Sequence, residues 1–335
     1  MRIVLDAMGS DAHPTPELEA AAAAARLWDE PLILTGPEGE LRPRLEALRV
    51  DSRRVQVVDA PDVLSMTDHP AESARGKPRS SMAVGIDLLH RGEADAFVTA
   101  GNTGGAMVTA LFRLGRIRGV KRPALAALFP VQTGRAVVLD IGANADCRPE
   151  YLLQFAVMGS VYAQLALGRD KPRVGLLSNG EEAEKGSTLV KETFPLLQRS
   201  GLNFVGNVES KEVYSGAVDV VVTDGFTGNV FLKTSEAVAR LLVDILKSEI
   251  RSGPVTTLGG VLALPALRRV RKLMDPAEVG AVPLLGIDGL VLVGHGRSDA
   301  RALVSALRGA RQAVESNLLP ALRQAVQRSP VAEAL

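Results

Sequence analysis

The chain has 335 residues, of which 46% are hydrophobic and 4% aromatic, and its formal net charge is +1. This length is sufficient for a large buried core. The scarcity of aromatic side chains argues against a binder of single-stranded nucleic acid, and the nearly neutral charge gives no sign of a nucleic-acid partner. With one cysteine, Cys147, the chain can form no internal disulfide and no zinc site built on thiolates.

The N-terminus favours a cytoplasmic protein. Residues 1–6 run directly into an apolar strand pattern, whereas a signal peptide has a basic start and a longer apolar stretch. No apolar stretch reaches the length of a transmembrane helix without charged or turn residues. We therefore expect a cytoplasmic location.

Short apolar segments alternate with helical patterns along the chain. The predicted strands are 2–7, 31–35, 55–59, 94–99, 124–129, 136–141, 173–177, 203–208, 218–223 and 290–293. The predicted helices are 15–28, 81–90, 103–114, 151–167, 189–199, 230–250 and 298–317. Many strands are rich in Val, Ile and Leu without alternation, which is typical of strands covered on both faces. The pattern predicts an α/β fold, a three-layer α/β/α sandwich around a mostly parallel sheet.

One segment departs from this alternation. We expect a single domain over 1–320, with a helical hairpin inserted near 252–276 and a C-terminal tail at 321–335. A helix there carries Leu264, Leu267 and Val270 on one side and the basic residues of 268–272 on the other. Such a helix suits either an anionic membrane surface or packing on the body or on a partner subunit.

Five predicted strands end in loops rich in small and polar residues. These loops are 101–105, 142–146, 178–182, 224–229 and 294–299. In a parallel sheet, ligands bind outside the carboxyl ends of the strands. Glycine lets the backbone approach a ligand, and the helices that follow present free N–H groups to anions. The sequence therefore predicts a site for a phosphate-bearing ligand at this edge.

Common catalytic signatures are missing. The chain has no Gly-x4-Gly-Lys-Ser/Thr, no Gly-x-Gly-x-x-Gly and no Gly-x-Ser-x-Gly segment. His90 and Asp95 have the His-x4-Asp spacing of some glycerolipid acyltransferases, but one ends a predicted helix and the other begins a strand, so we interpret the match as accidental. His295 is better placed, in a glycine-flanked loop. Cys147 is either a nucleophile toward a thioester or a small buried residue.

Several motifs occur in order between about residue 3 and residue 310. They are LDAMG (5–9), ADAFV (94–98), AGNTG (100–104), DIGAN (140–144), GNVE (206–209), DGFTGNV (224–230), PLLG (283–286), HG (295–296) and SDA (298–300). Together they resemble the bacterial acyl-carrier-protein:phosphate acyltransferases, the PlsX family. The chain departs from the family pattern at 178–180, at 280–283 and at Gly294, which affects the expected substrate preference and leaves the expected reaction unchanged.

The resemblance implies transfer of an acyl group from acyl carrier protein to inorganic phosphate, giving an acyl phosphate for phospholipid synthesis. It implies a homodimer, no organic cofactor, peripheral membrane association and a downstream membrane-bound glycerol-3-phosphate acyltransferase. The implied fold is similar to the phosphotransacetylases and the isocitrate/isopropylmalate dehydrogenases. Two other functions stay open: a coenzyme A-dependent short-chain phosphate acyltransferase, and a non-catalytic scaffold at a membrane surface.

The implied reaction makes modest chemical demands. Phosphate carries a charge of nearly −2 at neutral pH because its relevant pKa is about 6–7. The leaving thiol has a pKa of roughly 8.5. Positioning and stabilisation of the oxyanion therefore matter more than a strong base. We hypothesise direct attack of phosphate in a ternary complex, without an acyl-enzyme.

The predicted site combines the strand-end loops. The predicted catalytic residues are Asn102, Thr103, Asn144, Lys185, Asn229 and His295. The predicted substrate-binding residues are Gly101, Gly104, Asp140, Asp146, Asp224, Gly225, Thr227 and Gly228. The predicted membrane contacts are Val261, Leu264, Leu267, Arg268, Val270 and Arg271.

Some of these roles remain alternatives. Lys185 either supplies a cation for phosphate or is a surface lysine. Asp140, Asn144 and Asp146 either orient other groups or bind a metal; we favour orientation and predict no metal, because two carboxylates in one loop are a weak indication of one. The basic residues of 268–272 face either a membrane or the acidic acyl carrier protein.

Overall fold

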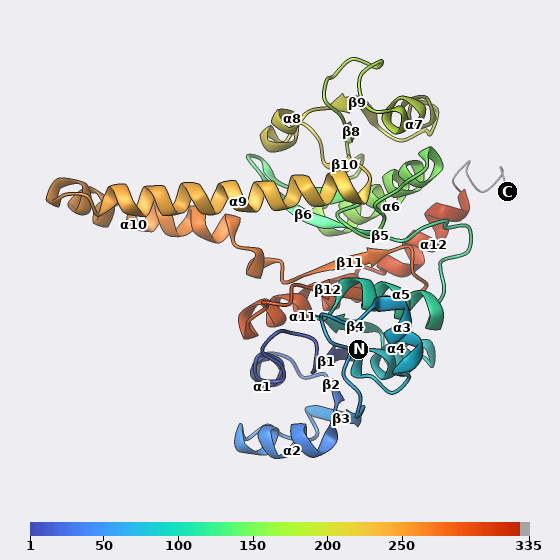
Figure 1. Ribbon diagram of the computed structural model, residues 1–335, viewed down its shortest axis with the longest axis vertical. Helices are drawn as coiled ribbons and strands as arrows, with labels where there is room; N and C mark the ends of the chain where they lie inside the picture. The colour runs from blue at the N-terminus through green and yellow to red at the C-terminus, as the bar shows by residue number, and fades with distance from the viewer. Residues whose placement is uncertain (329–335) are drawn as a thin grey trace.

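The strands form two sheets, which lie one above the other in Figure 1. The computed structural model describes residues 1–328, except for the side chains of residues 71 and 73. The seven-stranded sheet has the order β3 (Val55–Asp59), β2 (Leu32–Gly36), β1 (Ile3–Asp6), β4 (Ala96–Thr99), β12 (Val291–Gly294), β11 (Ala281–Leu285), β5 (Ala124–Leu125). The five-stranded sheet has the order β6 (Ala127–Val131), β7 (Gly134–Leu139), β10 (Val220–Val222), β8 (Val174–Leu177), β9 (Phe204–Val208). Only the pairings of β11 and the β6–β7 pair are antiparallel, so the expected mostly parallel architecture is confirmed.

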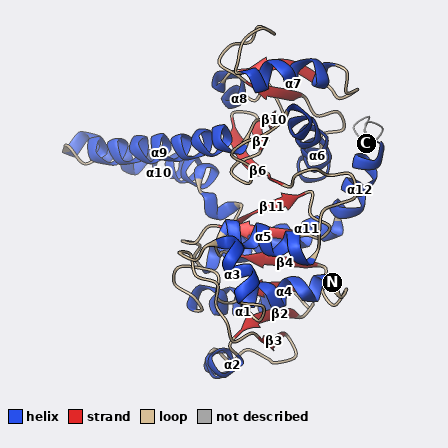
Figure 2. Cartoon of the chain, turned by 45° about the vertical axis from the view of Figure 1, so that its right-hand side comes forward, coloured by secondary structure: helices blue, strands red, loops and turns tan. Residues whose placement is uncertain are grey.

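Helices cover both faces of each sheet (Figure 2). In the first sheet α1 (Thr15–Leu27) and α11 (Ala300–Glu315) pack on one face, and α4 (Ser81–His90) and α5 (Thr103–Arg113) pack on the other. In the second sheet α6 (Pro149–Leu167) and α7 (Thr188–Gln198) pack opposite α8 (Ser210–Ser215). This cover explains why the strands are apolar on both sides, since every residue of β1, β4, β8 and β10 is buried.

The predicted strand at 124–129 is in fact two strands. Ala124 and Leu125 pair with β11, whereas the segment from Ala127 pairs with β7 of the other sheet. The chain thus crosses between the sheets at Ala126, where the apolar sequence continues without a turn signal. We did not predict β11, because the proline at 283 interrupts its short apolar run.

The C-terminal boundary also differs from the prediction. The helix α12 (Leu318–Arg328) packs on α6, and its residues Leu322 and Val326 are buried in the main core. Residues 321–328 are therefore part of the folded body and not of a tail, because their apolar side chains repeat at helical spacing. The remainder of the expected tail lies outside the described residues. Three more helices were absent from the prediction: α2 (Glu38–Ala47), α3 (Pro70–Gly76) and α8.

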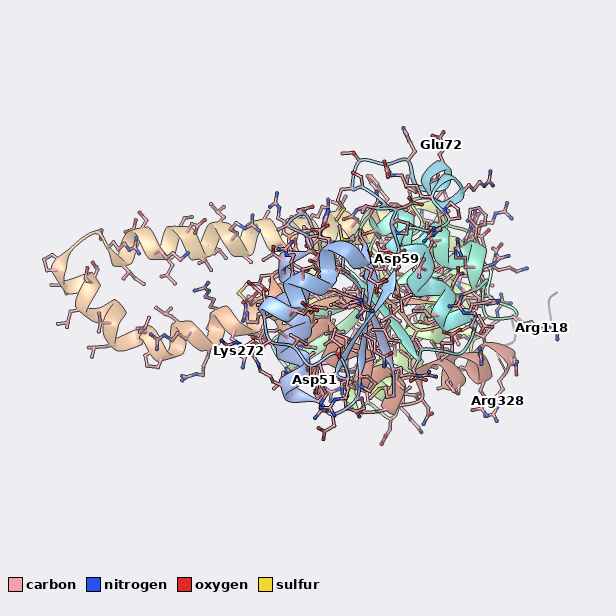
Figure 3. The ribbon with its side chains drawn as sticks, turned by 90° about the horizontal axis from the view of Figure 1, so that it is seen from below. Asp51, Asp59, Glu72, Arg118, Lys272 and Arg328 are labelled. Carbon is pink, nitrogen blue, oxygen red and sulfur yellow. The ribbon has the colours of Figure 1, made fainter. Side chains whose placement is uncertain are left out.

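A helical hairpin projects from the body (Figures 1 and 3). Its arms are α9 (Gly225–Ile250) and α10 (Pro254–Met274), so α9 begins five residues before the predicted helix at 230. No residue of α10 is buried, and in α9 only Gly225 and Gly228 are. The short helix η1 (Pro276–Glu278) returns the chain to β11. Among the described residues, no helix is both long and apolar enough to cross a membrane.

Candidate active site

The strand-end loops form two clusters. In the first, the loops after β1, β4 and β12 meet: the Asp11 N–H donates to the carbonyl of Gly296 at 2.7 Å, and Gly9 lies against the backbone of Gly101. In the second, the loop after β7 meets the start of α9, where the Gly225 N–H donates to the carbonyl of Asn144 at 2.8 Å. These contacts involve four of the five predicted loops, and the predicted loop at 178–182 is not among them.

Asp140 organises the second cluster. Its Oδ1 accepts the N–H groups of Leu125, Gly142 and Ala143 at 3.0–3.1 Å, and its Oδ2 accepts the N–H and the side-chain amide of Asn144 at 2.7 and 2.9 Å. Burial raises the pKa of the Asp140 carboxyl, and these donors oppose the rise. The carboxylate is therefore fully used in holding its own loop, and Leu125 ties that loop to the seven-stranded sheet.

Asn144 is likewise held in place. Its side-chain amide also donates to the carbonyl of Pro123 at 2.7 Å, and the residue is buried. Asp146, two residues later, is exposed. The structure thus places the two predicted residues of this loop differently: Asn144 fixes the backbone, and Asp146 faces solvent.

The start of α9 packs directly on this loop. A Cβ at Gly225 would lie 2.6 Å from the carbonyl oxygen of Asn144, and one at Gly228 would overlap the carbonyl oxygen of Asp140. Glycine is required at both positions because backbone meets backbone there. Asp224 caps the helix by accepting the Thr227 N–H at 2.8 Å and the Thr227 hydroxyl at 2.7 Å.

The start of α5 is built in a similar way. Asn102 caps the helix by accepting the N–H of Gly105 at 3.0 Å, and its amide donates to the carbonyl of Met66 at 3.0 Å. A Cβ at Gly104 would lie 2.8 Å from Pro70, so this glycine accommodates the segment that crosses the helix start. Thr103 is exposed, and among the described atoms, which leave out the side chains of residues 71 and 73, the backbone N–H groups of Thr103 and Gly104 have no partner. These two donors are free to bind an anion.

Two residues that we did not assign support the first cluster. Asp6, fully buried at the end of β1, accepts the Thr99 hydroxyl at 2.7 Å, and Thr99 in turn accepts the N–H of Gly101 at 2.9 Å. Burial raises the pKa of the Asp6 carboxyl. The sequence did contain a signal for this supporting role, because Asp6 is a polar residue at the end of the first strand and belongs to the motif LDAMG (5–9).

The remaining predicted residues lie at the rim. Lys185 and His295 are exposed, and the Nδ1 of His295 accepts the N–H of Arg297 at 3.1 Å. Asn229 lies in the first turns of α9 with its side-chain amide beside Gly142. Of these three, Asn229 is the one that faces a loop of the second cluster.

Cys147 is poorly suited to nucleophilic attack. It is partly buried, and its Sγ lies 3.6 Å from the carbonyl of Asn144. Burial raises the pKa of its thiol to about 12, so the thiol form dominates at neutral pH.

The fold is similar to that of several solved α/β proteins. It is similar to EutD phosphotransacetylase from Staphylococcus aureus, with a TM-score of 0.60, 18% identity and 94% of each chain covered. It is also similar to a phosphotransacetylase from Streptococcus pyogenes, with a TM-score of 0.62, 16% identity and 93% and 94% of the two chains covered. A 4-hydroxythreonine-4-phosphate dehydrogenase from Klebsiella pneumoniae shares the fold at a TM-score of 0.53 and 14% identity, covering 93% of this chain and 98% of its own.

Sequence comparison identifies the family. The model described as "Fatty acid synthesis protein" matches residues 1–320, so the chain belongs to this family, and the expected PlsX-family membership is confirmed. A phosphate acyltransferase of Elusimicrobium minutum is 47% identical over 325 residues, which are 97% of this chain and 95% of the relative. One from Pelotomaculum thermopropionicum is 45% identical over 327 residues, or 98% and 95% of the two chains.

Proposed function

We propose that the chain transfers the acyl group of an acyl carrier protein to inorganic phosphate and releases an acyl phosphate for phospholipid synthesis. The observation that carries this proposal is the pair of N–H groups of Thr103 and Gly104 at the start of α5, which have no partner in the part of the chain that the structure describes. A helix N-terminus with unpaired donors favours a dianion such as phosphate. Membership of the family and the similarity to phosphate acyltransferases at 45–47% identity support the same reaction.

The proposed step is a direct substitution at the thioester. A phosphate oxygen bound at Thr103 and Gly104 attacks the carbonyl carbon, and the carbonyl oxygen becomes an oxyanion. The side-chain amide of Asn229 donates to that oxyanion. The C–S bond then breaks, the thiolate leaves with the electron pair, and water protonates it. No base is needed because phosphate is already ionised.

A pair of substitutions at Thr103 tests the phosphate site. Thr103 is the first residue of α5, where proline is well tolerated, and Asn102 before it has φ −55° and ψ 114°, which suits a residue preceding proline. Thr103→Pro removes the N–H, whereas Thr103→Ala keeps it. We expect phosphate-dependent release of thiol from acyl carrier protein to fall about 100-fold in Thr103→Pro. Thr103→Ala should lose far less, and full activity of Thr103→Pro would refute the assigned role.

The thioester donor separates the competing functions. With wild-type protein we expect faster thiol release from acyl carrier protein than from short-chain acyl coenzyme A. Preference for the coenzyme A donor would instead favour the short-chain enzyme. If neither donor releases thiol in a phosphate-dependent way, the result would favour the non-catalytic scaffold at a membrane surface.

We propose further that the hairpin tip rests on the cytoplasmic face of a membrane, where it delivers the product to a membrane-bound glycerol-3-phosphate acyltransferase. The two most exposed large apolar side chains of the described residues, Val255 and Leu262, lie near the turn between the arms at 84% and 76% exposed, and Leu258 beside them is 63% exposed. Among the predicted contacts, Val261, Leu264 and Val270 are exposed, whereas Leu267 is partly buried. Arg268 and Arg271 are exposed on the same helix and can face anionic lipid.

We also propose a homodimer that uses α9. Leu241 and Ile245 are 58% and 49% exposed, and they share one side of the helix with Val238 and Leu242. Four such residues at helical spacing form a continuous apolar stripe, which a second copy of the hairpin can cover.

A further inference from the structure

A group of cations lies on the segment that leads from α5 to β5. We name residues 116–122 the basic segment; its cations are Arg116, Arg118, Lys121 and Arg122. The three arginines are exposed, and Lys121 is partly so. Within residues 1–328 none of these four side chains forms a salt bridge, and the segment itself contains no carboxylate.

The carboxylates that flank the basic segment already have partners. Asp87 pairs with Arg113, and Asp288, whose N–H donates to the carbonyl of Gly115, pairs with Arg323 at 2.7 Å. The positive charge of the segment is therefore not neutralised by these neighbours. Uncompensated charge on one surface attracts partners of the opposite sign and accelerates their association.

The backbone of the basic segment is held firmly. Ile117 and Val120 are buried, and the Ile117 N–H donates to the carbonyl of Gly286 at 3.0 Å. The side chain of Gln154, on α6, accepts the Lys121 N–H at 2.8 Å and donates to the carbonyl of Gly119 at 2.7 Å. Because the loop is already ordered, a partner that docks on it does not have to order its backbone.

The segment also leads directly into the candidate site. Arg122 precedes Pro123, whose carbonyl accepts the side-chain amide of Asn144, and β5 follows with the Leu125 N–H bound to Asp140. Burial raises the pKa of the Cys147 thiol, and the positive charge of Arg122 is a minor influence that lowers it. In Figure 3 Arg118 lies at the end of the body opposite the hairpin, whereas Lys272 lies near the hairpin base. The basic segment is thus a charged surface separate from that of α10.

We propose that the basic segment is the docking surface for the acidic acyl carrier protein, an inference that rests on the proposed function. A carrier protein presents its thioester on a flexible arm, so its body must dock beside the site rather than in it. The basic segment provides cations that form no salt bridge within residues 1–328, on a firmly held backbone next to the loop held by Asn144. The cations of α10 stand on a projecting hairpin instead.

Charge reversal tests this surface. Arg118→Glu/Arg122→Glu should raise the KM for acyl carrier protein about 10- to 100-fold, because like charges then face the acidic partner. The matched control is Arg269→Glu/Lys272→Glu, two exposed cations of α10 outside the predicted membrane contacts, which should leave that KM unchanged. A small acyl-pantetheine donor, which lacks the protein body, should be used equally well by all three proteins.

Each other outcome overturns the proposal. An unchanged KM in Arg118→Glu/Arg122→Glu would place docking elsewhere, and a raised KM in the control alone would place it on α10. An equal loss with acyl-pantetheine would mean that the substitutions damage the site.

A binding measurement separates this proposal from the proposed function. Fluorescence anisotropy of labelled acyl carrier protein follows docking without turnover. Loss of binding in Arg118→Glu/Arg122→Glu but not in the control supports the docking surface even if wild-type protein releases no thiol, whereas equal binding to all three proteins overturns it.

Discussion

The carboxylate of Asp140 accepts hydrogen bonds from four backbone N–H groups and one amide while fully buried. Asp140→Asn replaces one carboxylate oxygen with a donor that faces other donors. We expect the free energy of unfolding to fall by about 2–3 kcal/mol, measured by urea denaturation. Asp146→Asn, in the same loop but exposed, should change it by no more than about 0.5 kcal/mol. Similar values for the two variants would contradict the structural role of Asp140.

Cys147 gives a test of direct attack. Since burial raises the pKa of its thiol to about 12, the reactive thiolate is scarce at pH 8 and increases only as the pH approaches that value. Alkylation by iodoacetamide at pH 8 should therefore be roughly a thousandfold slower than that of free cysteine. Cys147→Ala should retain phosphate-dependent thiol release. Mass spectrometry that detects an acyl group on Cys147 during turnover would disprove direct attack.

Residue chemistry in the sequence predicted which loops lie at strand ends but not the structural task of each residue in them. We expected Gly104 and Gly228 to let the backbone approach a ligand, whereas both make room for another part of the chain, at Pro70 and at Asp140. A glycine has the same sequence signature whether its neighbour is a ligand or the protein itself. Only the packing of segments distant in sequence distinguishes the two.

At the scale of elements, strands with continuous apolar runs were predictable and those with interruptions were not. The apolar runs at β1, β4 and β10 are buried on both faces, so their composition alone predicts strands. The segment 124–131 is divided into β5 and β6 because the two parts join different sheets. β5 pairs with β11 of the seven-stranded sheet, and β6 pairs with β7 of the five-stranded sheet. The sequence of 124–131 carries no local mark of this change of partner.

The hairpin tip yields a prediction for α10. Leu258→Glu/Leu262→Glu places two charges where the structure exposes apolar side chains, so binding to vesicles that contain anionic lipid should be lost in a flotation assay. The control is Leu27→Glu, at the end of α1, where the apolar side chain is 57% exposed. Flotation of the tip variant at the wild-type level would rule out the tip as the membrane contact.

At the scale of the whole molecule, the apolar stripe of α9 predicts the assembly state. Leu241→Lys/Ile245→Lys puts two charges into the proposed contact between copies, and sedimentation velocity should show a monomer where wild-type protein is a dimer. Leu27→Lys should leave the dimer intact. A dimer that survives in the stripe variant would place the contact between copies on another surface.

The continuity of α9 has one more consequence. The helix has 26 residues and runs unbroken from the Asp224 cap to the turn of the hairpin, a length of about 39 Å at 1.5 Å per residue. Its first turn is locked to the Asp140 loop, and its last turn carries the tip. An α-helix resists compression along its axis, so α9 acts as a strut of set length. If a surface binds the hairpin tip, the length of α9 therefore sets the distance between that surface and the loop of Asp140, where phosphate and thioester are proposed to react.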